Sequence, residues 1–229
     1  MKKRKGIILA GGTGSRPKPM TGLLSKQVLP VYDKPMIYYP LSVLMLARIS
    51  EILVISSPEH LPQLRETIVR LGNLGVEFKF ISQPRPEGIA QALILGEGFL
   101  DGSPCALILG DNIFFGHGFS ETLQKADQNG SSAQIFVHHV NKPERYGVVE
   151  LNSDGKIIEI VEKPAVPRSN LAVTGLYFFD PSASQLARQL KPSQRGELEI
   201  TDLNLLYLKN NNLVFHELGR GVAWFDAGT

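Results

Sequence analysis

Short apolar runs alternate with helix-length amphipathic segments through the first half of the chain, and this order constrains the fold more than any other feature. The apolar runs typical of strands lie at residues 6–10, 52–56 and 106–109, and residues 76–82 alternate with period two, which also predicts a strand. The segments between them with helical length and periodicity lie at 35–48, 59–71 and 88–100. Strands that alternate with helices predict an α/β fold with a mostly parallel sheet covered on both faces.

The second half of the chain is richer in strands. Strand patterns lie at residues 132–140, 147–151, 156–161 and 173–179, and Asn152-Ser-Asp-Gly155 is a hairpin turn signal between the second and the third. Further elements are expected as helices at 181–190 and 199–209 and as short strands near 213–218 and 222–225. No repeat or linker separates the halves, so we expect a single domain over residues 1–229.

Composition and charge exclude several classes of protein. The 229 residues are 43% hydrophobic and 20% charged, as in ordinary globular domains, and the net charge is only +2. The protein therefore has no overall electrostatic field that would attract nucleic acid or an anionic membrane surface. No apolar run approaches the roughly 20 residues of a membrane span. Cys105 is the single cysteine and can form no internal disulfide. We expect a cytoplasmic protein that binds neither nucleic acid nor membrane.

A glycine-rich turn, Leu9–Thr21, follows the first strand. Glycines allow the backbone N–H groups to approach a phosphate, and Ser15 and Arg16 add matching donors. The turn is neither a Walker loop nor a dinucleotide fingerprint, because the required spacings are missing. Lys26 follows shortly afterwards, either as a solvated surface lysine or as a cation folded back onto a triphosphate.

Three acidic residues stand at the ends of strand patterns. Asp111 and Asp226 could share a magnesium ion at the carboxyl edge of the sheet, since Mg²⁺ uses one or two carboxylates plus substrate phosphates. The alternative interpretation is a helix N-cap for Asp111 and a turn residue for Asp226. Glu162 and Lys163 could form only a surface ion pair, or could place a carboxylate on sugar hydroxyls and an ammonium on a phosphate.

Together these motifs resemble the sugar-1-phosphate nucleotidylyltransferase family, and in particular its glucose-1-phosphate thymidylyltransferase branch. The family signature of glycines, arginine and lysine is similar to Gly11–Thr21 with Lys26 and Pro30. Further similar stretches are Tyr32–Ser42, Leu109–His117, Pro143–Val149, Val173–Tyr177 and Arg195–Asp202. The resemblance runs from Gly6 to Thr229, beyond which family members continue into helices used in subunit contacts.

The resemblance implies a Rossmann-like three-layer nucleotidyltransferase fold with an inserted sugar-binding β subregion. Its nucleotide-binding half would be about residues 1–130, and its sugar-phosphate-binding half about 131–229. It also implies that dTTP and α-D-glucose 1-phosphate yield dTDP-glucose and pyrophosphate, with Mg²⁺, by in-line attack on the nucleotide α-phosphorus. The product would serve dTDP-rhamnose and polysaccharide biosynthesis, and the enzyme would be a homo-oligomer.

Site residues follow from the resemblance position by position. Those matching the family's nucleotide site are Gly11, Gly14, Ser15, Arg16, Lys26, Gln83, Gly88 and Asp111. Those matching its sugar-phosphate site are Asn112, Tyr146, Gly147, Glu162, Lys163 and Val173. The implied catalytic groups are Arg16, Lys26, Asp111 and Lys163. The implied metal ligands are Asp111 and Asp226.

Three positions depart from the family pattern: Ser15 and Ala227 replace threonines, and Pro17 replaces a leucine. Proline removes a backbone N–H and biases Arg16 away from helical backbone angles. Two alternatives to the implied function therefore stay open. One is a protein that binds nucleotides or sugar nucleotides without turnover, and the other is the same reaction with UTP or another sugar 1-phosphate.

Overall fold

The computed structural model describes residues 2–11, 24–128 and 131–228. Its first half contains the predicted parallel sheet, in the order β5-β4-β1-β6. These strands are β1 (Lys5–Leu9), β4 (Glu51–Ser56), β5 (Glu77–Ser82) and β6 (Cys105–Leu109). In this register Ile8 lies between Val54 and Ile108. The nearly continuous apolar sequence of β1, β4 and β6 reflects burial on both faces of the sheet, whereas β5 lies at its edge and contains no buried residue.

The sheet continues into the second half through β11 (Leu171–Phe179), all nine residues of which are buried. Strand β11 runs antiparallel to β8 (Ala133–His139) at both of its ends, with a break in register between Val173 and Tyr177. It also pairs antiparallel with β6 toward its C-terminal end and with β9 (Gly147–Leu151) at Ala172. The remaining strands of the sheet are β10 (Ile157–Glu162), antiparallel to β9, and β12 (Leu213–Glu217), parallel to β8. Nine strands of the described residues thus form one sheet, and the predicted α/β fold is confirmed.

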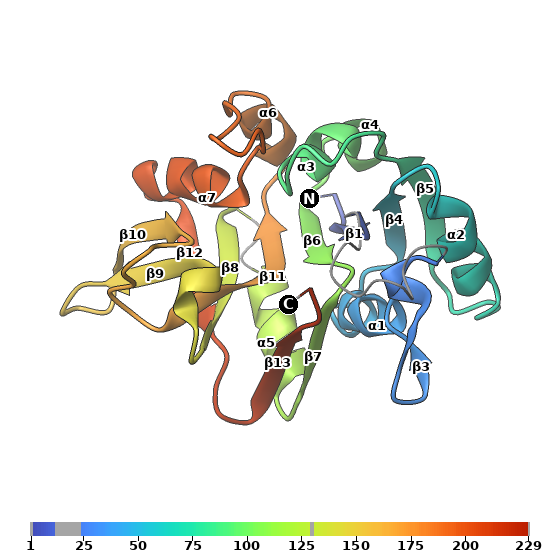
Figure 1. The fold of residues 1–229 in the computed structure, drawn as a ribbon, viewed down its shortest axis with the longest axis horizontal. Coiled ribbons are helices and arrows are strands. Elements are labelled where there is room, and N and C mark those ends of the chain that lie inside the picture. The colour runs from blue at the N-terminus through green and yellow to red at the C-terminus, as the bar shows by residue number, and fades with distance from the viewer. Residues whose placement is uncertain (1, 12–23, 129–130, 229) are drawn as a thin grey trace.

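Helices cover the two faces of this sheet and give it two separate apolar cores (Figure 1). One core contains Ile7 and Leu53, and it is covered by α3 (Gln91–Leu95), α4 (Glu97–Leu100), α6 (Ala183–Ala187) and α7 (Ile200–Lys209). The other contains Ile8 and Val54, and it is covered by α1 (Tyr38–Leu46), α2 (Leu61–Val69) and α5 (Phe119–Gln128). Adjacent residues of one strand enter opposite cores because side chains alternate along a strand.

The structure corrects several sequence-based boundaries. The helix predicted over residues 88–100 is two short helices that meet at Gly96, where a Cβ atom would lie 2.9 Å from Ile7 Cδ1. The helix predicted over 35–48 begins only at Tyr38, because Pro35 belongs to a small hairpin of β2 (Pro30–Val31) and β3 (Lys34–Pro35). The helix predicted over 181–190 is reduced to α6.

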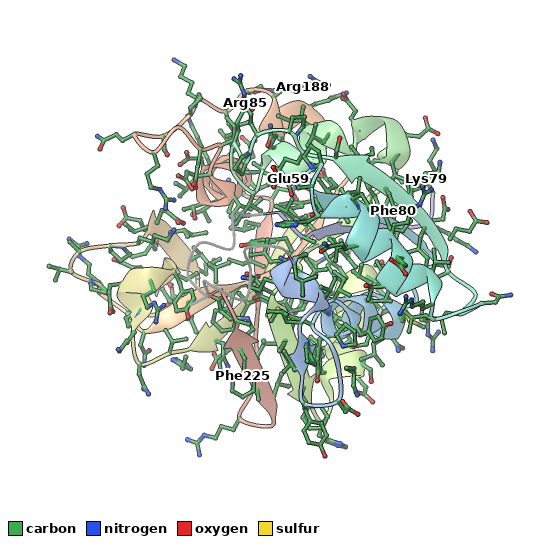
Figure 2. The ribbon with its side chains drawn as sticks, turned by 45° about the vertical axis from the view of Figure 1, so that its right-hand side comes forward. Glu59, Lys79, Phe80, Arg85, Arg188 and Phe225 are labelled. Carbon is green, nitrogen blue, oxygen red and sulfur yellow. The ribbon has the colours of Figure 1, made fainter. Side chains whose placement is uncertain are left out.

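Strand β7 (Asn112–Gly116) and helix α5 were not predicted from the sequence, whereas the short strand expected near 222–225 is present as β13 (Val222–Asp226). Strand β7 pairs antiparallel with β13 in a two-stranded ribbon, which brings residues far apart in the chain side by side. One face of the ribbon packs Phe114 and Val222 into the core, while Phe115 and Phe225 on the other face are exposed. Figure 2 shows Phe225 at the surface. Among the helices that the structure describes, none is both long and apolar enough for a bilayer span.

Candidate functional site

A pocket of about 160 Å³ lies between the β9–β10 hairpin, β11, β13 and the first turn of α7. All six positions expected to form the sugar-phosphate site line it, although they come from separate stretches of the chain: Asn112, Tyr146, Gly147, Glu162, Lys163 and Val173. Asp226 lines the same pocket. The structure therefore brings together residues that lie more than a hundred positions apart in the sequence, such as Asn112 and Asp226.

Local backbone geometry positions the residues at the mouth of the hairpin. Gly147 pairs with Glu162 across β9 and β10, and the backbone N–H of Lys163 donates to the Tyr146 carbonyl at 2.9 Å. A Cβ atom at Gly147 would lie 3.1 Å from Thr201 Oγ1, so glycine at this position keeps the pocket open. Lys163 has a φ of 44°, a left-handed conformation that non-glycine residues adopt at a cost of about 1–3 kcal/mol and that is common at functional sites.

The carboxylate of Glu162 is held from two sides. Thr201, buried in the first turn of α7, donates its hydroxyl to Glu162 Oε2 at 2.6 Å. Lys163 Nζ and Arg195 Nη2 lie 3.4 Å and 3.3 Å from Glu162 Oε1. Glu162 is therefore fixed in orientation with two cations beside it, an arrangement suited to a ligand that carries both hydroxyls and a phosphate.

Arg195 also lines the pocket and is held by a bidentate contact to Glu199. Its Nη2 atom lies 2.9 Å from Glu199 Oε1 and 2.8 Å from Oε2, and Glu199 Oε1 also accepts a hydrogen bond from Ser193. Burial lowers the pKa of Arg195, but the hydrogen bond and charge of Glu199 outweigh it and raise the pKa overall. The guanidinium is therefore a fixed positive charge at every working pH.

Asn112 connects three strands at the floor of the pocket. Its side chain is buried, and its Oδ1 atom accepts hydrogen bonds from the Gly175 backbone N–H at 3.0 Å and from Trp224 Nε1 at 2.6 Å. Its Nδ2 atom donates to Asp111 Oδ1 at 3.1 Å. Trp224 in turn packs against Tyr146, with ring centroids 5.1 Å apart. Asn112 therefore fixes the aromatic wall of the pocket and one oxygen of Asp111.

Asp111 and Asp226 converge at the edge of the pocket. The end of β13 folds over Asp111, because Ala227 N donates to the Asp111 carbonyl and Gly228 N donates to Asp226 Oδ1. A Cβ atom at Gly228 would lie 2.8 Å from Asp226 Oδ1 and 2.9 Å from Asp111 Oδ2. Burial, and then the charge of Asp111, raise the pKa of Asp226. On the other side, Lys26 Nζ forms an ion pair with Asp111 Oδ2 at 2.6 Å.

A second group of predicted residues follows strand β5. Gln83 is buried, its Nε2 atom donates to Gln91 Oε1 at 2.6 Å, and its Oε1 atom lies against Gly11, where any Cβ would overlap it. Gly88 has a φ of 103°, and its Cα packs so closely on the Leu198 backbone that a side chain would overlap it. Position 88 therefore requires glycine, whereas a side chain at position 11 would displace the Gln83 amide. Gly14, Ser15, Arg16 and Pro17 lie outside the described residues.

A comparison with known proteins identifies the family. The model of a nucleotidyl transferase family matches residues 5–229. A glucose-1-phosphate thymidylyltransferase of Xanthomonas campestris pv. campestris (strain B100) is 56% identical over all of this chain and 78% of its own length. The enzyme of that name from Neisseria meningitidis serogroup A is 52% identical over 98% of this chain and 78% of its own length.

The chain belongs to the nucleotidyl transferase family. Its relatives place it among the glucose-1-phosphate thymidylyltransferases, so it is a nucleotidyltransferase that forms dTDP-glucose. A solved structure assigned to such an enzyme from Bacillus anthracis, in complex with sucrose, has a TM-score of 0.90 and 42% identity, over 99% of this chain and 90% of that one. A UDP-glucose pyrophosphorylase complexed with UDP-glucose has a TM-score of 0.87 and 25% identity, over 100% and 94%.

The donor set of this thymidylyltransferase family member fits a magnesium ion. Within the described part of the chain, no cluster of three or more histidine, cysteine or acidic side chains could hold a metal by itself. Mg²⁺ in phosphoryl-transfer sites needs only one or two carboxylates, because substrate phosphates and water complete its octahedral shell. Asp111 and Asp226 supply two such carboxylates, and their mutual repulsion favours a cation between them.

Sequence reasoning assigned no role to Arg195, Glu199 or Thr201, although Arg195–Asp202 carried part of the resemblance. The signal available was an arginine followed within four residues by two glutamates, which also suits a surface ion-pair cluster. In the structure the start of α7 packs against the end of β10, and Thr201 and Arg195 thereby contact Glu162.

Proposed function

We propose that the pocket between β9, β10, β11 and α7 binds glucose 1-phosphate and that the nucleotide binds along Gly11, Lys26, Gln83 and Gly88. The observation that carries this proposal is the position of Asp226, which lines the sugar-phosphate pocket and also meets Asp111. The two substrates then approach each other at this carboxylate pair. The arrangement agrees with the general rule that ligands of open α/β sheets bind beyond the carboxyl ends of the strands.

In the proposed reaction, an oxygen of the sugar phosphate attacks the α-phosphorus of dTTP. A new bond forms between that oxygen and the α-phosphorus, and the bond from the α-phosphorus to the oxygen bridging to the β-phosphate breaks. The leaving group carries the electron pair away as pyrophosphate. The attacking phosphate has a second pKa of about 6, so it is mostly ionised at pH 7 and needs no general base.

The chain's own residues would act by positioning and by charge. Lys163 and Arg195 would bind the sugar phosphate, and Glu162, held by Thr201, would accept sugar hydroxyls. Lys26 would contact the nucleotide phosphates and, by the family resemblance, Arg16 the leaving pyrophosphate. Such preorganised cations lower the barrier because they need no reorganisation as charge develops.

Gln83 and Gly88 would read the thymine. A side-chain amide can both donate and accept, as the edge of a pyrimidine requires, and Gln91 holds the amide of Gln83 in one orientation. Asp111 and Asp226 would hold Mg²⁺. When bound, the metal supplies neutralisation of the phosphate charge and a fixed geometry for in-line displacement.

Pyrophosphate release tests the proposal, measured with dTTP and glucose 1-phosphate in the presence of Mg²⁺ and compared with UTP in place of dTTP. We expect kcat/KM to be higher with dTTP than with UTP. A parallel titration with dTDP-glucose distinguishes the alternative of binding without turnover. Tight binding of dTDP-glucose without pyrophosphate release would refute the proposed reaction.

A pair of variants tests the pocket. Arg195→Met should lower kcat/KM by about 10²–10³, as deleting one transition-state donor does, with the larger KM change for glucose 1-phosphate. Arg188→Met is the matched control, because Arg188 pairs with Glu97 on the surface, away from the pocket (Figure 2). Equal losses for the two variants would contradict the assignment of the sugar-phosphate site.

The expected homo-oligomer and cytoplasmic location stay predictions.

A further inference from the structure

We infer that the ammonium group of Lys26 and a divalent cation compete for the same oxygen of Asp111, so that Lys26 holds the metal site closed until a nucleotide draws the ammonium away. This inference rests on the proposed function, in which Asp111 and Asp226 hold Mg²⁺. It goes beyond that function because it gives Lys26 a role before the nucleotide binds.

Both oxygens of Asp111 have partners in the structure. Oδ1 accepts from Asn112 at 3.1 Å, and Oδ2 pairs with Lys26 Nζ at 2.6 Å. Oδ2 also borders the same space as the second carboxylate, since a Cβ atom at Gly228 would lie 2.9 Å from Asp111 Oδ2 and 2.8 Å from Asp226 Oδ1. A cation held by both aspartates from this space would meet the oxygen that Lys26 holds.

The charges around Asp111 disfavour the binding of a metal ion in the absence of nucleotide. The two carboxylates carry two negative charges, and the adjacent ammonium cancels one of them. A dication would have to displace Lys26 or bind beside it against like-charge repulsion. Lys26 and Asp111 are 16% and 20% exposed at the side chain, so solvent screens this repulsion only partly.

Only the side chain of Lys26 would need to move. The backbone is fixed in the short 3-10 helix η2 (Lys26–Val28), where the preceding Ser25 accepts from Gln27 N and Leu29 N donates to the Lys26 carbonyl. The flexible four-carbon stem ends in an ammonium that can exchange one anionic partner for another. Nucleotide phosphates offer such a partner, and their arrival would free Oδ2 for the metal. Metal and nucleotide would therefore each increase the affinity for the other.

Titration with Mn²⁺, followed by the electron paramagnetic resonance signal of the free ion, tests this inference on the full chain. Lys26→Met keeps the length of the stem without its charge, and we expect it to bind Mn²⁺ without nucleotide at least about tenfold more tightly than wild type. Lys26→Arg keeps the charge and should stay close to wild type. Lys34→Met is the matched control, because Lys34 pairs with Asp33 on the β2–β3 hairpin, away from Asp111 (Figure 1).

A second measurement needs no variant. The rate of Lys26 acetylation by an amine-reactive reagent, read by peptide mass spectrometry with Lys34 as the internal reference, should rise severalfold when Mg²⁺ saturates the wild-type protein. An unchanged Lys26 rate under these conditions would overturn the inference. So would Mn²⁺ binding by Lys26→Met that is no tighter than that of wild type.

Asp226→Asn separates this inference from the proposed function. If wild type binds Mn²⁺ and Asp226→Asn weakens that binding, the metal site is where we propose, and the Lys26 results decide the inference alone. If Asp226→Asn binds Mn²⁺ as wild type does, with and without dTTP, the metal site is elsewhere and both proposals fail.

Discussion

Replacing Asn112 by aspartate isolates one interaction at the floor of the pocket. The two side chains have nearly the same shape, and an aspartate oxygen can still accept from Gly175 N and Trp224 Nε1. The Nδ2 atom that donates to Asp111 Oδ1 at 3.1 Å would become an oxygen. At neutral pH the variant therefore places two carboxylates against each other in a buried position, with Asp226 as a third nearby.

The loss of stability in Asn112→Asp is limited, because the new carboxyl can bind a proton instead of carrying a charge. Two like charges about 4 Å apart cost about 4 kcal/mol at an effective dielectric constant of 20. The alternative is to keep the new carboxyl protonated, which costs 1.36 kcal/mol for each pH unit above its unfolded pKa of about 3.9, or about 4 kcal/mol at pH 7. Lys26 offsets part of this repulsion, so we expect Asn112→Asp to lower the free energy of unfolding by about 2–4 kcal/mol at pH 7.

The pH dependence gives the decisive result. The folded-state pKa of the new carboxyl is raised, so its unfavourable contribution is absent below the unfolded pKa, where both states bind the proton. Stability relative to wild type is then lost as the pH rises toward the folded-state pKa. The protonated carboxyl can also donate to Asp111, which restores the native hydrogen bond. Urea unfolding at pH 4.5, 5.5 and 7 should show a difference that grows with pH.

Asn112→Ala is the control for this prediction. It leaves the Gly175 and Trp224 donors without their acceptor, at a cost of about 1–3 kcal/mol that does not depend on pH over this range. If Asn112→Asp and Asn112→Ala lost the same stability at all three pH values, the contact between Asn112 and Asp111 would not exist as described, and the reasoning would be refuted.

Three further predictions concern the site. Asp111→Asn should nearly abolish pyrophosphate release while the thermal unfolding temperature stays close to that of wild type, and retained activity would remove Asp111 from the metal site. Gln83→Ala should raise KM for dTTP more than for glucose 1-phosphate in steady-state kinetics, and equal effects would contradict base reading. Gly88→Ala should lower the free energy of unfolding in urea by about 1–3 kcal/mol, because its positive φ and its contact with the Leu198 backbone exclude a side chain; a neutral change would show that the loop can move aside.

The parallel strands could be predicted because each is a compact signal in the sequence. Strands β1, β4 and β6 are buried on both faces, so they are uninterrupted apolar runs next to helix-length segments. Strand β7 gives no such signal, since Phe114 enters the core while Phe115 is exposed, and its partner β13 lies more than a hundred residues later. Pairing across that distance depends on the finished sheet.

The same reasoning explains which site residues the sequence revealed. The six residues predicted for the sugar-phosphate site, all of which line the pocket, were identified by resemblance. Their local patterns alone also allowed other interpretations, such as a surface ion pair for Glu162 and Lys163. Thr201 and Arg195 were missed because they join the site through contacts with Glu162, which is 39 and 33 residues away in the chain. Hydrogen bonds between side chains at such separations leave no periodic trace, and only the packing of α7 against β10 makes them.

The segment that contains Arg195 also contacts the loop that carries Gly88. Leu198 N donates to the Glu87 carbonyl at 2.7 Å, and Ala90 N donates to the Leu198 carbonyl at 3.2 Å. These bonds fasten the loop that carries Gly88 to the chain between Arg195 and Glu199. The pairing of β11 and β6 likewise continues the sheet of the first half into the second, and the single domain over residues 1–229 stays a prediction.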